Sequence, residues 1–206
     1  MSDIFEAIRQ GDLEQVQALA SAAGPARNED GVSALLFARY HGRLDMVEAI
    51  RPHAGELDAF EAAALGDAPR LREVLARDDD AARAWSGDGY TALHYACFFG
   101  TAEAAQVLVD AGADLEVIAR GDNKVAPLQS AAAGGNVGAA RVLLDAGADV
   151  NCREEGRFTP LHSAAQGGNV ELARLLVERG ADREAKLADG RTPRDLAESD
   201  ELRALL

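Results

Sequence analysis

In this 206-residue chain, one histidine and one cysteine are spaced as two ligands of a metal ion could be. His94 and Cys97 stand three positions apart, which would place both on one face of a helix as two metal ligands. A tetrahedral site needs two further ligands, and no other Cys or His lies nearby in the sequence. His162 also lacks a neighbouring nucleophile or acid with which to form a catalytic set. We therefore expect structural histidines, with no catalytic residue, no metal site and no cofactor.

A glycine-rich stretch and two acidic runs are the other candidates. Gly134-Gly135-Asn136-Val137-Gly138 has the composition of a phosphate-binding loop, but it lacks the Gly-x-Gly-x-x-Gly spacing and a preceding strand. We interpret it as a turn between two helices. The acidic runs Asp78-Asp79-Asp80 and Glu154-Glu155 are interpreted as solvated loops, with contact to a basic partner as the alternative.

The charge balance argues against two classes of partner. Asp and Glu number 35 against 21 Lys and Arg, for a formal net charge of −14. Such a surface repels nucleic-acid phosphates and anionic lipids, which proteins hold mainly through Lys and Arg. No apolar run approaches the ~18 residues of a membrane-spanning helix. We expect no binding to nucleic acid and no binding to a membrane.

The N-terminus and the cysteines predict a cytoplasmic protein. The chain does not begin with basic residues followed by an apolar stretch, so no secretory signal is expected. The two cysteines, Cys97 and Cys152, fit neither a disulfide framework nor a zinc spacing. Two buried thiols in a reducing compartment explain them best.

The elements that must position these residues recur along the chain. Three segments align, and each is followed by a glycine-ended turn, an amphipathic stretch and a closing Gly-Ala-Asp: Gly89–Ala96, Ala126–Ala132 and Thr159–Ala165. The equivalent leucines are Leu93, Leu128 and Leu161, separated by 35 and 33 residues. A period of this length indicates stacked helical repeats.

These segments resemble the ankyrin repeat family, whose unit is a turn and two antiparallel helices with a Thr-Pro-Leu-His-x-Ala signature. The match is best from about Gly87 to Leu206 and degraded upstream. The resemblance implies an all-α ankyrin-repeat solenoid of about six to seven helix-turn-helix units with short β-hairpin turns. It implies a single domain, 1–206, with these units: an N-terminal capping unit at 1–27, degenerate repeats at 28–56 and 57–85, well-matched repeats at 86–119, 120–152 and 153–186, and a C-terminal cap at 187–206.

Departures from the family pattern predict local irregularities. Only 24 residues separate the turn glycines Gly42 and Gly66, which leaves no room for a full hairpin, so we expect a gap in the row of turns near 52–55. Lys124 and Arg157 stand where the pattern has a turn glycine. Both hairpins are therefore expected to depart from the usual geometry.

The resemblance also implies that the protein binds another protein, since ankyrin proteins usually bind through the turn tips and the outward positions of the first helices. Those positions line the concave face and hold these residues: Tyr40, His41, Leu65, Asp88, Tyr90, Phe98, Phe99, Asp122, Phe158 and Gln166. Aromatic residues at the centre with acidic turn residues around them predict a partner with apolar anchors flanked by Lys or Arg. The alternative for Phe98 and Phe99 is packing between repeats.

The predicted function is thus a monomeric, non-catalytic scaffold or regulator that binds a partner protein through its concave face. The alternative is a small-molecule- or metal-binding regulatory protein, or an enzyme, with its site in the concave groove. That alternative requires polar groups that converge in a pocket.

Overall fold

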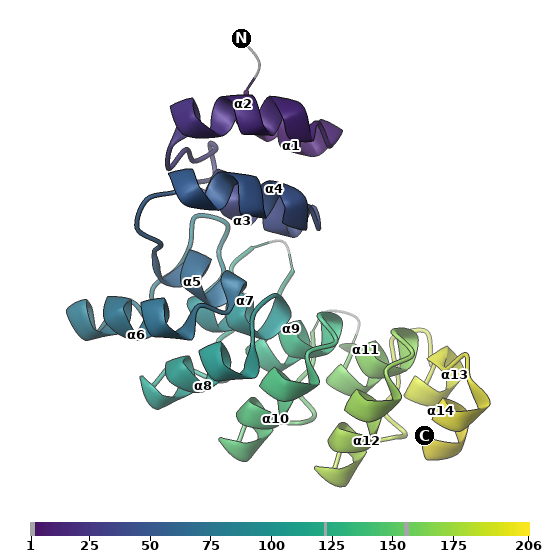
Figure 1. The fold of residues 1–206 in the computed structure, drawn as a ribbon. Helices are drawn as coiled ribbons and strands as arrows, with labels where there is room; N and C mark the ends of the chain where they lie inside the picture. The colour runs from purple at the N-terminus through teal and green to yellow at the C-terminus, as the bar shows by residue number, and fades with distance from the viewer. Residues whose placement is uncertain (1–2, 122, 155–156) are drawn as a thin grey trace.

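The computed structural model describes residues 3–121, 123–154 and 157–206 and places them in seven stacked pairs of antiparallel helices (Figure 1). The first helices of the pairs form the inner layer: α1 (Ile4–Gln10), α3 (Ala34–Tyr40), α5 (Ala59–Leu65), α7 (Ala92–Phe98), α9 (Pro127–Ala133), α11 (Pro160–Gln166) and α13 (Pro193–Leu196). The second helices form the outer layer: α2 (Leu13–Ala23), α4 (Leu44–Ile50), α6 (Ala68–Arg77), α8 (Ala102–Asp110), α10 (Val137–Asp145), α12 (Val170–Glu178) and α14 (Asp200–Leu205). The predicted all-α solenoid is confirmed.

Capping residues fix where the helices begin. The Thr159 hydroxyl accepts a hydrogen bond from the backbone N–H of His162, while Pro160 occupies the first turn, where its missing N–H costs nothing. At the start of α10, Asn136 caps Ala139 through its side-chain oxygen and donates from its amide to the Gly100 carbonyl of the preceding pair, at 3.2 Å. The same side chain therefore starts a helix and joins two repeats.

The core is continuous because each pair buries its small and aliphatic residues against the next. The equivalent leucines Leu93, Leu128 and Leu161 are at most 1% exposed, and each such burial contributes about 2 kcal/mol. Alanines let the inner helices approach closely. At Gly134 any larger residue would be excluded, because a Cβ atom there would lie 2.4 Å from the Phe98 carbonyl oxygen. None of the helices in the described ranges is long and apolar enough to cross a membrane.

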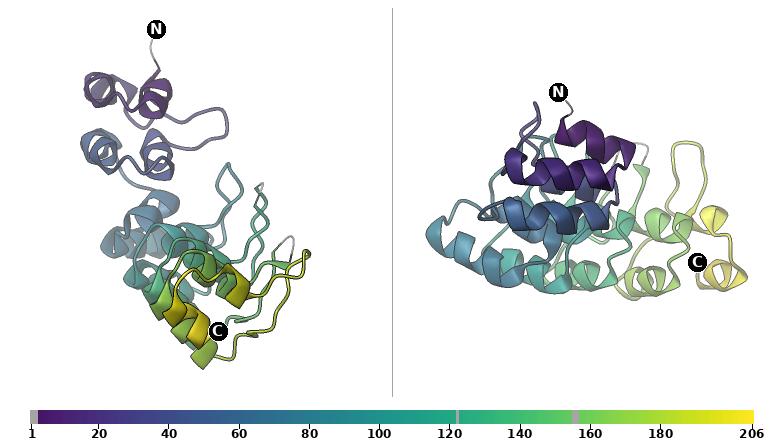
Figure 2. Two further views of the ribbon diagram at one scale, coloured as in Figure 1. Left: turned by 90° about the vertical axis from the view of Figure 1, so that its right-hand side faces the viewer. Right: turned by 45° about the horizontal axis from the view of Figure 1, so that its top comes forward.

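Except before the third pair, the turns between pairs are hairpins without a β ladder. Backbone hydrogen bonds close them, such as Ser86 N–H to the Tyr90 carbonyl at 2.8 Å and Leu187 N–H to the Arg191 carbonyl at 2.9 Å. Within the described residues the β structure amounts to one isolated antiparallel bridge, between Arg27 and Ser33. These turns project from one edge of the stack, beside the inner helices (Figure 2).

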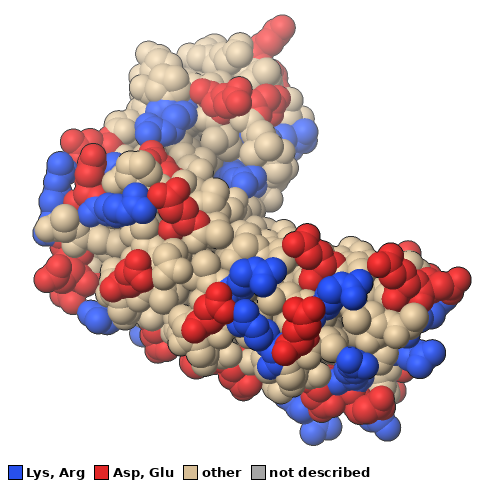
Figure 3. Space-filling view, turned by 60° about the horizontal axis from the view of Figure 1, so that its bottom comes forward, with Lys and Arg blue, Asp and Glu red and all other residues tan. Residues whose placement is uncertain are grey.

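The stack bends between the second and third pairs. Helix α4 runs into a short 3-10 helix, η1 (Arg51–His53), and α5 already begins at Ala59, so no hairpin precedes the third pair. The other neighbouring outer helices pack against each other, but α4 and α6 barely touch. Figure 1 shows the two N-terminal pairs set at an angle to the rest of the stack, and the space-filling view in Figure 3 shows the bent outline of the molecule.

The two cations that replace turn glycines behave differently. Arg157 adopts a left-handed backbone, with φ of 67°, as glycine would. Lys124 does not, and its ammonium instead donates to the Arg120 carbonyl at 3.0 Å. The two hairpins therefore differ in backbone geometry.

Candidate functional site

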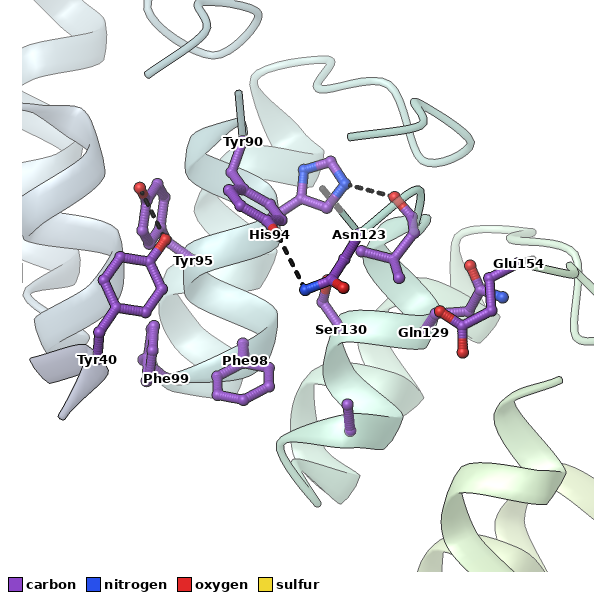
Figure 4. A pocket seen from close by; sticks show the side chains of 12 residues that line it. Tyr40, Tyr90, His94, Tyr95, Phe98, Phe99, Asn123, Gln129, Ser130 and Glu154 are labelled. Carbon is purple, nitrogen blue, oxygen red and sulfur yellow. Dashed lines mark hydrogen bonds between the residues drawn. The ribbon is translucent and has the colours of Figure 1, made fainter. Parts of the chain in front are cut away.

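A pocket of about 330 Å³ opens on the inner face of the stack, on the side of the bend. It is lined by residues of α3, α7 and α9 and of the turns that precede α7, α9 and α11: Tyr40, Tyr90, His94, Tyr95, Phe98, Phe99, Asn123, Val125, Gln129, Ser130, Ala133 and Glu154. Figure 4 shows the aromatic residues on one side and the polar residues of the later repeats on the other.

The aromatic side of the pocket, called the aromatic wall below, consists of Tyr40, Tyr90, Tyr95, Phe98 and Phe99. It joins the second and fourth helical pairs. The Tyr40 ring lies edge-on to Phe99 with centroids 5.2 Å apart, and Phe98 and Phe99 stand 4.6 Å apart. Such edge-to-face pairs are worth about 0.5–1.5 kcal/mol each beyond the area they bury. Tyr40 is 40% exposed and Phe98 41% exposed, whereas Phe99 is half-buried. Phe98 is therefore available to a partner, but Phe99 is part of the packing.

Arg39 secures Phe99 in place. Its guanidinium stands 5.2 Å from the centre of the Phe99 ring and donates to the Phe99 carbonyl at 2.6 Å. The sequence left open whether Phe98 and Phe99 contact a partner or pack between repeats. Phe99 packs between repeats, whereas Phe98 is exposed at the helix end, and its contact with a partner stays a prediction.

Asp88, a half-buried residue, is engaged as a hydrogen-bond acceptor within the protein, and its predicted contact with a partner stays a prediction. Its carboxylate accepts hydrogen bonds from Tyr40 at 2.5 Å, from Tyr95 at 2.7 Å and from the Ser86 hydroxyl. Burial, followed for Tyr95 by the hydrogen bond to Asp88, raises the pKa of Tyr40 and Tyr95 above the ordinary value, so both phenols stay protonated. The Asp88 carboxylate thus holds the rings of Tyr40 and Tyr95 in place through their hydroxyl groups.

His94 lines the pocket but has both ring nitrogens engaged. Nδ1 lies 2.8 Å from the Thr91 hydroxyl, and Nε2 lies 3.0 Å from the Val125 carbonyl oxygen of the next turn. Burial lowers the pKa of His94, so its neutral form is favoured. Cys97 is fully buried behind the helix, where burial raises the pKa of its thiol. The described residues contain no group of three His, Cys, Asp or Glu side chains suited to a metal.

The Glu154 side chain, which lines the pocket, forms no hydrogen bond or ion pair with any residue in the described ranges. It lies across the pocket from Tyr40 (Figure 4). Burial raises the pKa of its carboxyl group above the ordinary value. The neighbouring Gln129 is already occupied, because its amide donates to the Phe158 carbonyl at 3.2 Å. Glu154 thus presents a half-buried carboxylate to a largely apolar pocket.

The pocket gathers some of the residues chosen from the sequence and leaves others apart. Tyr40, Tyr90, Phe98 and Phe99 line it, with Asp88 directly behind. The remaining choices lie elsewhere: His41 is exposed beside Phe37, Leu65 is half-buried, Phe158 packs on His162, and Gln166 is exposed at the end of α11. Asp122 lies outside the described residues. Whether any of these side chains contacts a partner stays a prediction.

Sequence reasoning missed Tyr95 and gave Glu154 no specific role. Tyr95 carried a signal, because it stands where the equivalent positions of the aligned repeats hold Ser130 and Ser163. A large aromatic at a position of small residues indicates a changed inner surface. No comparable signal distinguished Glu154 from its acidic neighbours.

Comparison with known proteins settles the family. A family model described as ankyrin repeats (3 copies) matches residues 4–119 and 59–154. A second family model, described as ankyrin repeats (many copies), matches residues 143–197. The chain belongs to the ankyrin repeat family. This ankyrin repeat protein is also 42% identical over 82 residues to a probable E3 ubiquitin-protein ligase, XBOS31, of Oryza sativa subsp. japonica. That similarity covers 39% of the chain, which spans only 18% of the length of the relative.

Proposed function

We propose that this protein binds a partner protein through its inner face, with the aromatic pocket as the anchor site, and performs no chemistry of its own. Ankyrin repeats are in general protein–protein interaction modules. The observation that carries the proposal is the open wall formed by Tyr40, Tyr90 and Phe98, since large aromatic side chains left partly exposed around a cavity are typical of binding hot spots.

The partner we propose presents an extended segment with apolar and basic side chains. The pocket is lined from α3 to the turn before α11, so a bound segment would cross several repeats. A net charge of −14 attracts a basic segment and speeds its encounter with the protein. We further propose a cytoplasmic monomer, which fits two buried cysteines that form no disulfide.

Two other functions have less support. A metal or small-molecule site around His94 would need a free ring nitrogen, and both nitrogens have close partners. Ligase activity is not transferred from the rice relative, because the chain spans only 18% of that protein. Neither function explains the exposed aromatic wall.

The test compares two exposed apolar side chains. Phe98→Ala removes the centre of the proposed anchor site, and Leu44→Ala removes a 55% exposed side chain on an outer helix. After crosslinking and purification of the partner from the native host, we expect Phe98→Ala to weaken binding about thirtyfold, or ~2 kcal/mol. Leu44→Ala should bind like the wild type. Unchanged affinity of a folded Phe98→Ala variant would place the interface elsewhere.

A further inference from the structure

We propose that the pocket receives an arginine side chain of the partner, with the guanidinium held between the aromatic wall and the Glu154 carboxylate. This inference rests on the proposed function for the statement that the ligand belongs to a protein. The preference of the pocket for a guanidinium group stands on its own geometry and can be measured separately.

The aromatic wall offers the first half of such a site. Tyr and Phe rings attract a cation placed over their faces, with about 0.5–2 kcal/mol gained as the pair loses contact with water. The protein repeatedly pairs its own arginines with aromatic rings. Arg39 stands 5.2 Å from the Phe99 ring centre, and Arg120 stands 3.9 Å from that of Trp85. The rings of Tyr90 and Phe98 line the pocket without such a partner among the described residues.

Glu154 offers the second half. A half-buried carboxylate without a cation is unfavourable, and the raised pKa of Glu154 reflects that cost. Asp88, a further carboxylate near the pocket, already accepts hydrogen bonds from two tyrosines and a serine. Arg39 does not pair with Glu154, because its guanidinium is directed to the Phe99 ring and carbonyl. An incoming cation would therefore be bound by Glu154, at the opposite side of the pocket from Tyr40 (Figure 4).

Arginine fits these surroundings better than lysine. A planar guanidinium stacks on flat rings and forms two parallel hydrogen bonds to one carboxylate, whereas a lysine ammonium is a compact point charge. The methylene stem of arginine would lie against the apolar part of the lining, at Val125 and Ala133. The volume of about 330 Å³ suits one long side chain rather than a folded domain.

The test uses a short probe peptide, acetyl-Gly-Ser-Arg-Ser-Gly-amide, and its citrulline counterpart, which has nearly the same shape but no charge. Binding is followed by NMR through the ring signals of Tyr90 and Phe98. We expect saturable shifts with the arginine peptide and at least about fivefold weaker binding of the citrulline peptide. Equal binding of the two peptides, or no binding of the arginine peptide, would overturn the proposal.

Three variants identify the groups responsible. Glu154→Gln should weaken binding of the arginine peptide about fivefold and leave the citrulline peptide unaffected. Glu178→Gln makes the same charge change on an exposed glutamate of α12 and should leave both affinities unchanged. Phe98→Leu keeps an apolar side chain but removes the ring, so it should also weaken arginine binding. Wild-type affinity in Glu154→Gln would contradict the assignment.

The outcome separates the two proposals. If Phe98→Ala abolishes capture of the native partner while arginine and citrulline peptides bind alike, the protein-binding function holds and the arginine site does not. If the arginine peptide binds selectively while the native partner tolerates Phe98→Ala, the site exists but is not the interface.

Discussion

Tyr40 donates a hydrogen bond to Asp88 at 2.5 Å, although the two residues are 48 positions apart and a complete helical pair lies between them in the sequence. The contact is possible because no hairpin precedes that intervening pair. The turn before the second pair thus meets the turn before the fourth, where a Cβ atom on Gly87 would lie 1.7 Å from the Asp30 carbonyl oxygen. The missing hairpin and the aromatic pocket both follow from the short spacing of 24 residues between Gly42 and Gly66.

Tyr40→Phe should destabilise the protein by about 1–2 kcal/mol, because it removes the hydroxyl that donates to Asp88 but keeps the ring against Phe99. Urea denaturation measures the change. Tyr90→Phe is the matched control, since among the described residues its hydroxyl takes part only in a long hydrogen bond from Asn123, at 3.4 Å. Equal losses in the two variants would mean that the Tyr40–Asp88 bond contributes nothing specific.

Hydrogen exchange should be faster in the two N-terminal pairs than in α7 to α12. In repeat proteins, stability is roughly a sum over units and their interfaces, and the interface between the second and third pairs lacks both a hairpin and a close α4–α6 contact. Amide exchange measured by mass spectrometry tests this. Protection that is uniform along the stack would contradict it.

Acidification through the ordinary histidine pKa should destabilise the protein, in part through His94. Because burial lowers the pKa of His94, the unfolded chain binds more protons than the folded chain as the pH falls from about 7.5 to 5.5. The free energy of unfolding therefore falls with pH over that window. It stops falling once the folded histidine is also protonated.

His94→Gln should make the stability less dependent on pH in that window. The fifth repeat already has Gln129 at the equivalent position, where the side chain accepts a hydrogen bond from Ala126 N–H at 2.8 Å and donates to the Phe158 carbonyl. Glutamine thus keeps the bonding but does not titrate. Denaturation curves at several pH values give the slope, and a variant as sensitive to pH as the wild type would exclude His94 as the source.

Arg157→Gly should stabilise the protein by about 0.5–1 kcal/mol, since glycine adopts the left-handed backbone at 157 without the strain that a Cβ atom adds. Thermal unfolding is a sufficient measurement. Lys124→Gly is the control at the equivalent turn position, where the backbone is not left-handed, and it should bring no gain. A larger gain at 124 than at 157 would show that backbone strain does not decide the effect.

The sequence by itself determined the architecture, because each repeat contains the residues that start, end and bury its own helices. Thr159 and Pro160 start a helix, Gly66 ends one, and Leu93, Leu128 and Leu161 recur at a spacing that buries them in the same place in each unit. These signals act within one repeat or between neighbouring repeats. They can therefore be recognised without knowledge of distant contacts.

Only the tertiary structure decided how the aromatic residues are used. Tyr40, Asp88, Tyr95 and Phe99 meet across an intervening pair of helices, and no periodic pattern records a contact that skips a repeat. In the folded protein Asp88 accepts hydrogen bonds from Tyr40 and Tyr95, whereas Phe98 stays exposed, although both residues had looked alike as surface positions. Folding likewise placed Glu154 across the pocket from Tyr40, and its partial burial is a property of the assembled stack that the residue type alone does not show.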